Sequence, residues 1–363
     1  MKAARLHEVG KPLRVENVSE PTIRAGSAIV RVLCAHVFSY TRKVINGELG
    51  YDLPELPFTP GTGAIAVIEA IADDVFGLEV GQTVFCDPYI YSRNPSAKPD
   101  GILLGWTGLT PASSRTQSLW KDGVFAKKVL FPADCLTPIP QAQEFSSQKL
   151  VYLDYLTVAY GGLLRADFCP SQTLVVNGAT GGLGSATVLL ALAMGAAKIV
   201  AVGRNEDQLK ALEQLDKRVV SVAVEGDIDS DSQKIKDAAK VGVDTVIDLL
   251  PSLPTPEPTL TALNALRRGG TAVFVGGVSA DIPLPYHKIM VEQLTIKGSF
   301  MYPKHAASEL IKMIEAGVLS LEPVKPYAFS LDEIEAAIDK ASSLTGFDYC
   351  VVVPNRDEKA KRD

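Results

Sequence analysis

A glycine-rich turn between an apolar strand and an apolar helix constrains this chain more than any other sequence feature. The run from Thr173 to Asn177 has the character of a buried strand, and an Ala/Leu-rich segment of helical length begins at Gly182. The glycines of this region are Gly178, Gly181, Gly182 and Gly184. Glycines allow the backbone to turn tightly and to approach a pyrophosphate, while the helix N-terminus offers free N–H groups and a positive dipole end. This order predicts a dinucleotide-binding βαβ unit, although a glycine-rich turn can also be purely structural.

The rest of the chain follows two kinds of pattern. Before about residue 140, short apolar runs separated by Pro, Gly and Asp predict a β-rich domain. From about residue 145, strand-length and helix-length segments alternate, which predicts a parallel sheet with helices on both faces. Beyond residue 300 the pattern predicts amphipathic helices at 304–317 and 331–343 and a last strand at 349–353. We therefore expect an α/β protein with a doubly wound domain, residues 146–301, inserted into a β-rich domain, residues 1–145 completed by 302–363.

Composition excludes several classes of protein. With 47% hydrophobic and 21% charged residues, the 363-residue chain is predicted to be globular and not disordered. Its net charge of −6 and the lack of a basic stripe argue against a nucleic-acid partner. The longest apolar run, residues 186–197, falls short of the ~20 residues that a membrane-spanning helix needs. Isolated cysteines without a CxxC pair, together with an N-terminus that has no apolar signal segment, predict a cytoplasmic location.

The residues at the end of the second predicted strand of the βαβ unit indicate which dinucleotide binds. In the common fingerprint, an acidic residue about 20 positions after the glycines accepts hydrogen bonds from the ribose 2′-OH. Here the strand ends instead in Gly203, Arg204 and Asn205. Gly203 leaves room, Arg204 can pair with a 2′-phosphate, and Asn205 is predicted to cap the next helix, with Gln208 at the capping-box position. The sequence therefore predicts NADP(H) as the cofactor, while a solvated surface arginine is the alternative interpretation of Arg204.

Four stretches together resemble the medium-chain dehydrogenase/reductase superfamily over essentially the whole chain. They are Pro57-Phe-Thr-Pro-Gly-Thr-Gly-Ala64, Gly123-Val-Phe-Ala-Lys-Lys-Val-Leu-Phe-Pro-Ala-Asp134, Leu153-Asp-Tyr-Leu-Thr-Val-Ala-Tyr-Gly161 and Ala179-Thr-Gly-Gly-Leu-Gly184. The resemblance implies a GroES-like β-domain, a Rossmann cofactor domain, an active site in the cleft between them and a possible homodimer. Together with the position of the predicted strand ends, it implies a cofactor site formed by Thr157, Ala179, Thr180, Gly181, Gly182, Leu183, Gly203, Arg204, Asn205, Gly276, Gly277, Val278 and Phe300.

The sequence departs from the zinc enzymes of this superfamily at their metal-binding positions. Those alcohol dehydrogenases bind a catalytic zinc through two cysteines and a histidine, and by alignment Phe38 falls on the first cysteine, Thr62 on the histidine and Asp154 near the second cysteine. Phe38 cannot bind a metal, and one carboxylate is not enough for Zn²⁺, which needs three protein ligands. The four histidines, His36 among them, are scattered and are interpreted as packed or surface side chains. The chain therefore resembles the zinc-independent quinone oxidoreductases and enoyl reductases, and no metal site is predicted.

Two tyrosines are the candidate catalytic residues. Without a Lewis acid, the charge that develops on a substrate oxygen must be stabilised by a hydrogen-bond donor. By resemblance, Tyr40 falls where alcohol dehydrogenases keep a proton-relay hydroxyl, and Tyr51 lies close to a catalytic tyrosine of enoyl reductases. Each tyrosine is alternatively an ordinary half-buried aromatic residue, and an enolate can also take its proton from water. Thr157 either faces the nicotinamide, as in quinone oxidoreductases, or caps a helix.

Apolar side chains are expected to surround the substrate. Phe38, Phe300, Met301 and Tyr302 suggest a hydrophobic pocket, or alternatively a core between domains. Residues 89–122 have weak periodicity and are predicted to form a long loop, whose Trp106 and Trp120 contribute to the pocket wall. We therefore expect an NADPH-dependent, zinc-independent oxidoreductase that reduces an activated C=C bond or a quinone in a small, largely apolar molecule. The alternatives are a zinc-free carbonyl/alcohol or imine reductase of the same fold, and a nucleotide-binding protein without turnover.

Overall fold

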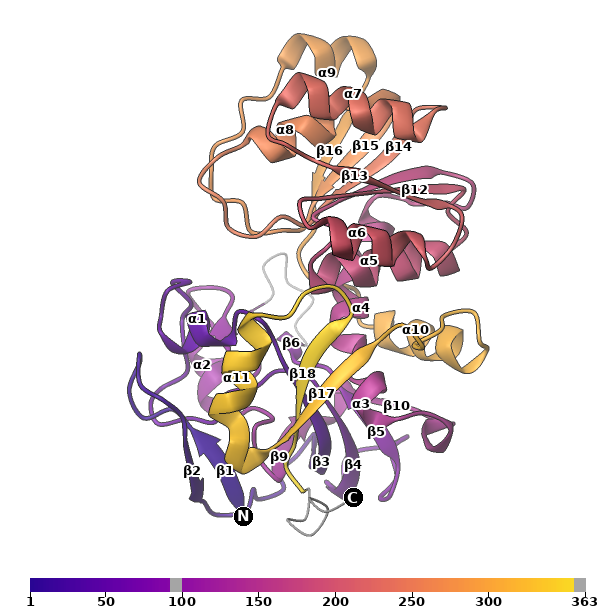
Figure 1. Cartoon of the computed structure of the whole chain (residues 1–363). Helices are drawn as coiled ribbons and strands as arrows, with labels where there is room; N and C mark the ends of the chain where they lie inside the picture. Colours follow the sequence, from indigo (N-terminus) through magenta and orange to yellow (C-terminus); the bar gives the residue numbers. More distant parts are fainter. Residues whose placement is uncertain (92–99, 356–363) are drawn as a thin grey trace. The chain divides into compact units, whose positions relative to one another are not determined.

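The computed structural model describes residues 1–91 and 100–355, which form two compact units (Figure 1). The first unit contains Met1–Asp154, Val324–Leu344 and the chain from Asp348 onward, and the second contains Tyr155–Pro323 and Thr345–Phe347. The chain thus leaves the first unit, forms the second and returns. The boundaries lie later than the expected residues 145 and 302, because 146–154 stay with the first unit and helix α10 (Ala306–Glu315) packs within the second. The predicted α/β fold class is confirmed.

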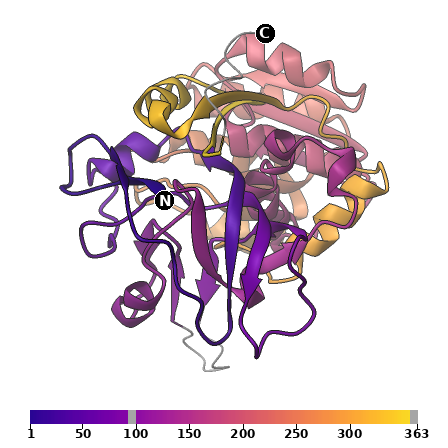
Figure 2. The same ribbon diagram turned by 90° about the horizontal axis from the view of Figure 1, so that it is seen from below.

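In the described part of the chain, a seven-stranded and largely antiparallel sheet forms the centre of the first unit. Its order is β10-β5-β4-β3-β18-β17, with β9 paired to β3. These strands are β3 (Ser27–Val37), β4 (Ala64–Ile71), β5 (Thr83–Cys86), β9 (Lys128–Pro132), β10 (Leu136–Pro138), β17 (Lys325–Ser330) and β18 (Asp348–Val353). Strand β18 pairs with β3 through Cys350↔Val37 and Val352↔Ala35, so the last strand of the chain lies beside one from its first forty residues (Figure 2).

Shorter elements complete the first unit. They are β1 (Lys2–Arg5), β2 (Arg14–Asn17), β6 (Tyr89–Tyr91), β7 (Gly101–Leu103), β8 (Thr107–Gly108), α1 (Thr41–Ile45), α2 (Ser114–Leu119), α3 (Ser147–Leu150), α11 (Ile334–Ser342) and three 3₁₀ turns at Ala133–Cys135, Ala142–Glu144 and Leu331–Glu333. The prediction of a loop over 89–122 is therefore wrong for its described residues, which contain β6, β7, β8 and α2. These elements are too short to leave a periodic sequence pattern. Residues 92–99 of that stretch lie outside the described residues.

A parallel sheet carries the second unit. Among the described residues its strand order is β13-β12-β11-β14-β15-β16, and every neighbouring pair is parallel. The strands are β11 (Thr173–Asn177), β12 (Lys198–Gly203), β13 (Val219–Ala223), β14 (Val243–Asp248), β15 (Leu266–Phe274) and β16 (Thr295–Gly298). The helices, besides α10, are α4 (Leu153–Arg165), which starts in the first unit, α5 (Gly182–Ala193), α6 (Glu206–Glu213), α7 (Ile228–Ala239), α8 (Glu257–Asn264) and α9 (Tyr286–Glu292). The strand order reverses between β11 and β14, which is where doubly wound sheets bind ligands.

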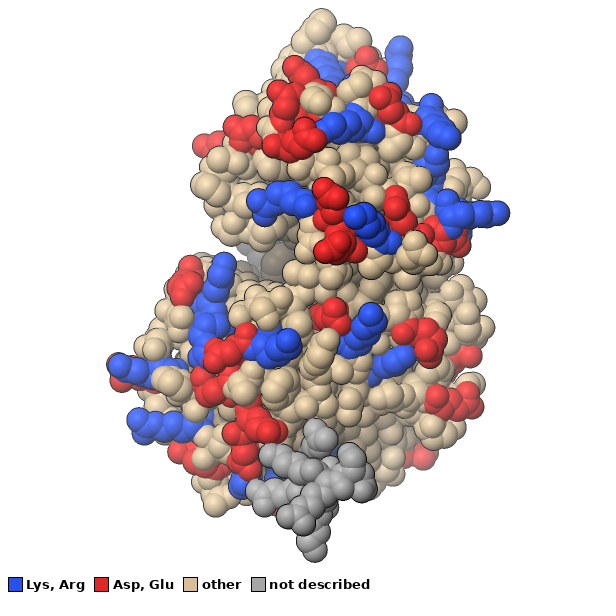
Figure 3. Space-filling view, viewed as in Figure 1, with Lys and Arg blue, Asp and Glu red and all other residues tan. Residues whose placement is uncertain are grey.

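Charged side chains of both signs are interspersed over the face of the molecule in view (Figure 3). The absence of a nucleic-acid partner stays a prediction. Within the part of the chain that the structure describes, no helix combines the length and the apolar character that crossing a bilayer requires.

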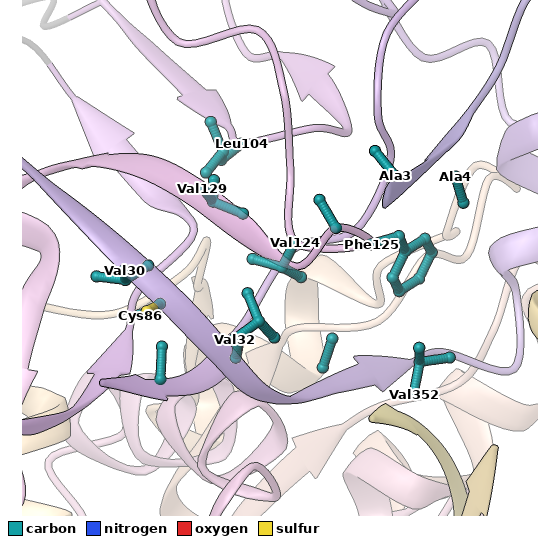
Figure 4. Packing of buried hydrophobic residues seen from close by; sticks show 14 of the residues in the cluster. Ala3, Ala4, Val30, Val32, Cys86, Leu104, Val124, Phe125, Val129 and Val352 are labelled. Carbon is teal, nitrogen blue, oxygen red and sulfur yellow. The ribbon is translucent and has the colours of Figure 1, made fainter. Parts of the chain in front are cut away.

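The core of the first unit draws residues from distant parts of the sequence (Figure 4). Ala3 of β1, Val30 of β3, Phe125 and Val352 of β18 are all buried in one hydrophobic cluster. The backbone N–H of Ala4 donates to the carbonyl oxygen of Phe125 at 2.8 Å, which ties β1 to the segment before β9. This core fixes the carboxyl end of β3 and the segment that precedes β4, and both carry residues of the candidate site.

Candidate functional site

The glycine-rich turn has the geometry that the sequence predicts. Strand β11 ends at Asn177, Gly178 adopts a φ of +86°, and Gly181 stands at the N-cap of α5. A Cβ on Gly184 would lie 2.2 Å from the Gly178 carbonyl oxygen, so glycine is required there for the helix to pack against the turn. A Cβ on Gly181 would meet only that same oxygen at 3.7 Å, which is ordinary contact. Packing of the turn against α5 therefore does not require glycine at 181, and the space beside Gly181 suits a phosphate at the helix N-terminus.

The end of β12 carries the predicted determinants of cofactor choice. Arg204 is exposed and forms no ion pair with any residue that the structure describes. Asn205 caps α6, since its Oδ1 accepts a hydrogen bond from the Gln208 N–H at 3.1 Å, which confirms that prediction. A Cβ on Gly203 would lie 2.7 Å from Cγ2 of Thr180, so strand β12 and the phosphate turn approach each other closely. This strand end fits the adenosine 2′-phosphate of NADP(H) for two reasons. Arg204 offers a guanidinium that can pair with a phosphate, and the strand lacks the terminal carboxylate of the common fingerprint.

The segment after β15 lies beside the same sheet edge. Asp248, the last residue of β14, is buried, which raises the pKa of its carboxyl group, and it accepts from the Leu250 N–H at 3.1 Å. The N–H of Gly276 donates to the Asp248 carbonyl oxygen at 3.0 Å. A Cβ on Gly276 would lie 2.2 Å from the Leu250 carbonyl oxygen, whereas a Cβ on Gly277 would come no closer than 3.5 Å to any atom. Local packing therefore explains Gly276, whereas it does not require a glycine at 277.

The remaining cofactor candidates lie on α4 and after β16. Thr157 is fully buried within α4, several residues past the start of that helix, so it does not serve as the helix cap that was the alternative. Phe300 is 67% exposed, Met301 has a φ of +57°, and Tyr302 is buried. Sequence reasoning missed Gly346, whose N–H donates to the Thr180 carbonyl oxygen at 2.9 Å and so brings the returning chain onto the phosphate turn.

An aromatic cluster in the first unit joins Phe38 and Tyr40, two of the residues predicted to lie near the substrate. The Phe38 ring stacks on Tyr40 with centroids 5.1 Å apart, and Trp106 contacts Tyr40 edge-on at 6.2 Å. Trp106 is 1% exposed, and its Nε1 has no hydrogen-bond partner among residues 1–91 and 100–355. The prediction that Trp106 belongs with the pocket residues is consistent with these contacts. Tyr51 is 36% exposed, its partial burial raises the pKa of its hydroxyl, and no ring contact within the described residues links it to this cluster.

A buried polar group lies against the aromatic cluster, and sequence reasoning missed it. The Thr62 hydroxyl donates to Asp154 Oδ2 at 3.3 Å, and His36 Nδ1 lies 3.5 Å from the same oxygen. The His36 ring packs on Phe38 with centroids 4.1 Å apart. Thr62 precedes β4, Asp154 stands in the first turn of α4, and His36 is near the end of β3. Residues so far apart in the sequence leave no local signal of their contact.

This group does not fit a catalytic zinc. Phe38 offers no ligand atom, and Thr62 is a hydroxyl, so the positions aligned with the family's ligands supply one carboxylate. No group of three or more His, Cys, Asp or Glu side chains able to hold a metal occurs among the described residues. Since a zinc site needs at least three protein ligands, we derive no chemistry through a metal.

Two family models match the chain. Residues 24–141 match the alcohol dehydrogenase GroES-like domain, and residues 182–316 match the zinc-binding dehydrogenase family. An alcohol dehydrogenase from Moraxella sp. (strain TAE123) is 30% identical over 317 residues, which cover 87% of this chain and 89% of that protein. An NAD-dependent alcohol dehydrogenase from Sulfurisphaera tokodaii is 28% identical over 98% of this chain and 100% of that protein.

Solved structures share the fold. A putative zinc-binding dehydrogenase from Sinorhizobium meliloti bound to NADP matches with a TM-score of 0.77 at 21% identity, over 97% of this chain and 99% of that one. A thermostable alcohol dehydrogenase from Pyrobaculum aerophilum matches with a TM-score of 0.77 at 18% identity, over 98% of this chain and 99% of that one. With its GroES-like and Rossmann-type units, the chain belongs to the medium-chain dehydrogenase/reductase superfamily of oxidoreductases.

Proposed function

We propose that this chain transfers a hydride between NADP(H) and a polarised double bond of a small, largely apolar molecule, and that it does so without zinc. The observation that carries the proposal is the filling of two metal-ligand positions by Phe38 and Thr62. Without a Lewis acid, the reaction best suited to the site adds hydride to a carbon conjugated to a carbonyl group, as in an enone or a quinone, because the charge spreads to an oxygen that a hydrogen bond can stabilise. Two groups are candidate donors of that hydrogen bond. One is the buried Trp106 N–H, which has no acceptor among the described residues, and the other is the hydroxyl of Tyr40, whose ring contacts Trp106.

The choice of NADP(H) is supported by the end of β12. Of the relatives, one structure is bound to NADP and one protein is named NAD-dependent, so the superfamily does not decide the cofactor. Here the strand ends without a carboxylate, and the exposed Arg204 supplies a charge that can pair with a 2′-phosphate. When bound, the nicotinamide supplies or accepts the hydride. The N-terminus of α5 holds the pyrophosphate, and Gly277 leaves room for the nicotinamide half.

Reduction of a carbonyl group, or oxidation of the corresponding alcohol, is the second candidate. It is favoured by the names of the relatives, since the Moraxella protein with 30% identity is an alcohol dehydrogenase. In this reaction the proton must reach a heteroatom, whereas in the first it reaches an enolate. An imine would behave as the carbonyl does.

Transfer of deuterium distinguishes these functions. Labelled NADPH is incubated with the protein and a panel of enones, quinones, ketones, aldehydes and imines, and the products are analysed by NMR. Deuterium at a β-carbon, or reduction of a quinone, supports the first function; deuterium on a carbonyl or imine carbon supports the second. Saturable NADPH binding without oxidation of any panel member contradicts both and leaves a nucleotide-binding protein without turnover.

Self-association as a homodimer is a further proposal. Strand β16 is an edge strand of the second unit's sheet, and the neighbouring α9 carries the exposed apolar side chains Tyr286 and Met290. An edge strand beside exposed apolar groups favours pairing with a second copy. Light scattering coupled to size-exclusion chromatography tests this, and a monomer at micromolar concentration contradicts it.

A further inference from the structure

The buried group of Asp154, Thr62 and His36 has no part in the tyrosine chemistry described above. Asp154 and Thr62 are each 3% exposed, and His36 is 1% exposed. Placing a carboxylate in such surroundings costs several kcal/mol unless charges or hydrogen bonds compensate it, and apolar residues of similar volume are often at least as stabilising. The carboxylate therefore adds little to stability by burial alone, and we look for its role in the chemistry of the site.

The surrounding residues are fitted to this carboxylate. A Cβ on Gly63 would lie 2.4 Å from Asp154 Oδ1, so any other residue at 63 would displace the side chain. Asp154 stands in the first turn of α4, where the positive end of the helix dipole favours a negative charge. The His36 imidazole packs against Phe38, with ring centroids 4.1 Å apart. It also contacts Tyr349 edge-on, with ring centroids 5.3 Å apart. In this arrangement Nδ1 is the imidazole nitrogen that lies toward Asp154, 3.5 Å from its Oδ2.

We infer that Asp154 exchanges the proton of the reaction through the Thr62 hydroxyl, and that His36 is a positioning residue for the carboxyl group. The inference rests on the proposed function. In reduction, the hydride forms the new C–H bond and the electron pair of the double bond moves toward the substrate oxygen. The Thr62 hydroxyl gives its proton to the resulting anion and takes in its place a proton that Asp154 relays from solvent. In oxidation the same protons move in reverse, and the only other reactant in either direction is the nicotinamide.

Steady-state kinetics of isosteric variants test the relay. Thr62→Val removes only the hydroxyl and Asp154→Asn removes only the charge, so each should lower kcat on the order of 10²-fold, as for loss of a general acid. The KM for NADPH should stay unchanged. The double variant should be no slower than the slower single variant, because both changes interrupt one proton path. Thr62→Ser, which keeps the hydroxyl, should retain kcat.

A matched control separates catalysis from folding. Asp231 of α7 is also buried, at 1% exposed, and accepts from the Gly226 N–H at 2.8 Å while pairing with Lys234 at 3.0 Å. Asp231→Asn should lower the melting temperature without changing the kcat of the folded protein. His36→Phe keeps a ring against Phe38 and should lower kcat at constant substrate KM, whereas a packing role alone would leave kcat unchanged.

The outcomes are distinguishable. A wild-type protein that oxidises NADPH with no panel substrate overturns the proposed function and this inference with it. Wild-type turnover together with an Asp154→Asn variant of normal kcat overturns the inference alone. Fully additive losses in the double variant exclude a single path through Thr62 and overturn it as well. One tightly bound zinc per chain, measured by mass spectrometry of the wild-type protein, would also overturn it, because the carboxylate would then be a ligand.

Discussion

Exchange of Gly181 and of Gly184 for alanine, one at a time, separates a glycine that the fold needs from one that the ligand needs. Gly181 has a φ of −80°, which any residue adopts, and its added Cβ would meet nothing closer than 3.7 Å. Alanine reduces the freedom of the unfolded chain, a gain of about 0.4–1 kcal/mol, but is a poorer N-cap than glycine by a similar amount. The two effects nearly cancel, so we expect the melting temperature of Gly181→Ala to stay within about 2 °C of wild type.

The affinity for NADPH should respond quite differently. The methyl group of Gly181→Ala occupies the space through which the pyrophosphate reaches the N-terminus of α5, and the loss of one hydrogen bond to a charged group amounts to about 1.5–3 kcal/mol. This corresponds to a dissociation constant roughly 10- to 150-fold higher. Titration of NADPH fluorescence measures it, and differential scanning fluorimetry without nucleotide measures the stability.

Gly184→Ala is the control. Its Cβ would lie 2.2 Å from the Gly178 carbonyl oxygen and 2.7 Å from Ala179 Cα, so α5 must move. Overpacking of this kind costs about 1–3 kcal/mol, which lowers the melting temperature by roughly 2–12 °C. A Gly181→Ala variant that binds NADPH with wild-type affinity refutes the assignment of this turn to the pyrophosphate. Equal destabilisation by both exchanges refutes the packing argument.

Four further predictions concern the cofactor side of the site, the aromatic cluster and the metal. Arg204→Ala should raise the dissociation constant for NADPH about 5- to 150-fold and leave NADH binding almost unchanged, since only NADPH carries the 2′-phosphate; equal losses for both nucleotides would make Arg204 structural. Because a Cβ at Gly203 would lie 2.7 Å from Thr180 Cγ2, Gly203→Asp should shift preference toward NADH only when combined with Thr180→Ala, as measured by the ratio of kcat/KM for the two nucleotides. Tyr40→Phe, which removes a candidate hydrogen-bond donor to the substrate oxygen, should lower kcat on the order of 10²-fold and Tyr51→Phe should not, because Tyr40 belongs to the aromatic cluster; the reverse result would assign the donor to Tyr51. The purified protein should hold less than one zinc per chain, and a chelator should leave its turnover intact; loss of activity with EDTA would contradict the zinc-free proposal.

The sequence by itself determined the features that depend on neighbouring residues. The strand, turn and helix from Thr173 to Ala193 could be predicted because a buried strand, glycines with a required backbone geometry and a helical run follow one another directly. The cap at Asn205 is equally local, since donor and acceptor are three residues apart. That Phe38 offers no metal ligand also follows from its side chain alone, whereas zinc-independence of the whole protein stays a prediction.

Only the tertiary structure decided what these residues meet. The contact of His36, Thr62 and Asp154 joins a strand end, a loop and a helix start, and no period of 2 or 3.6 residues encodes such a meeting. The same holds for Gly181 and Gly184, which look alike in the sequence, although a Cβ would lie 3.7 Å from the Gly178 carbonyl oxygen at 181 and 2.2 Å from it at 184. Burial and close approach are set by segments that are distant in the sequence, and so the partners of a residue appear only once the chain has folded.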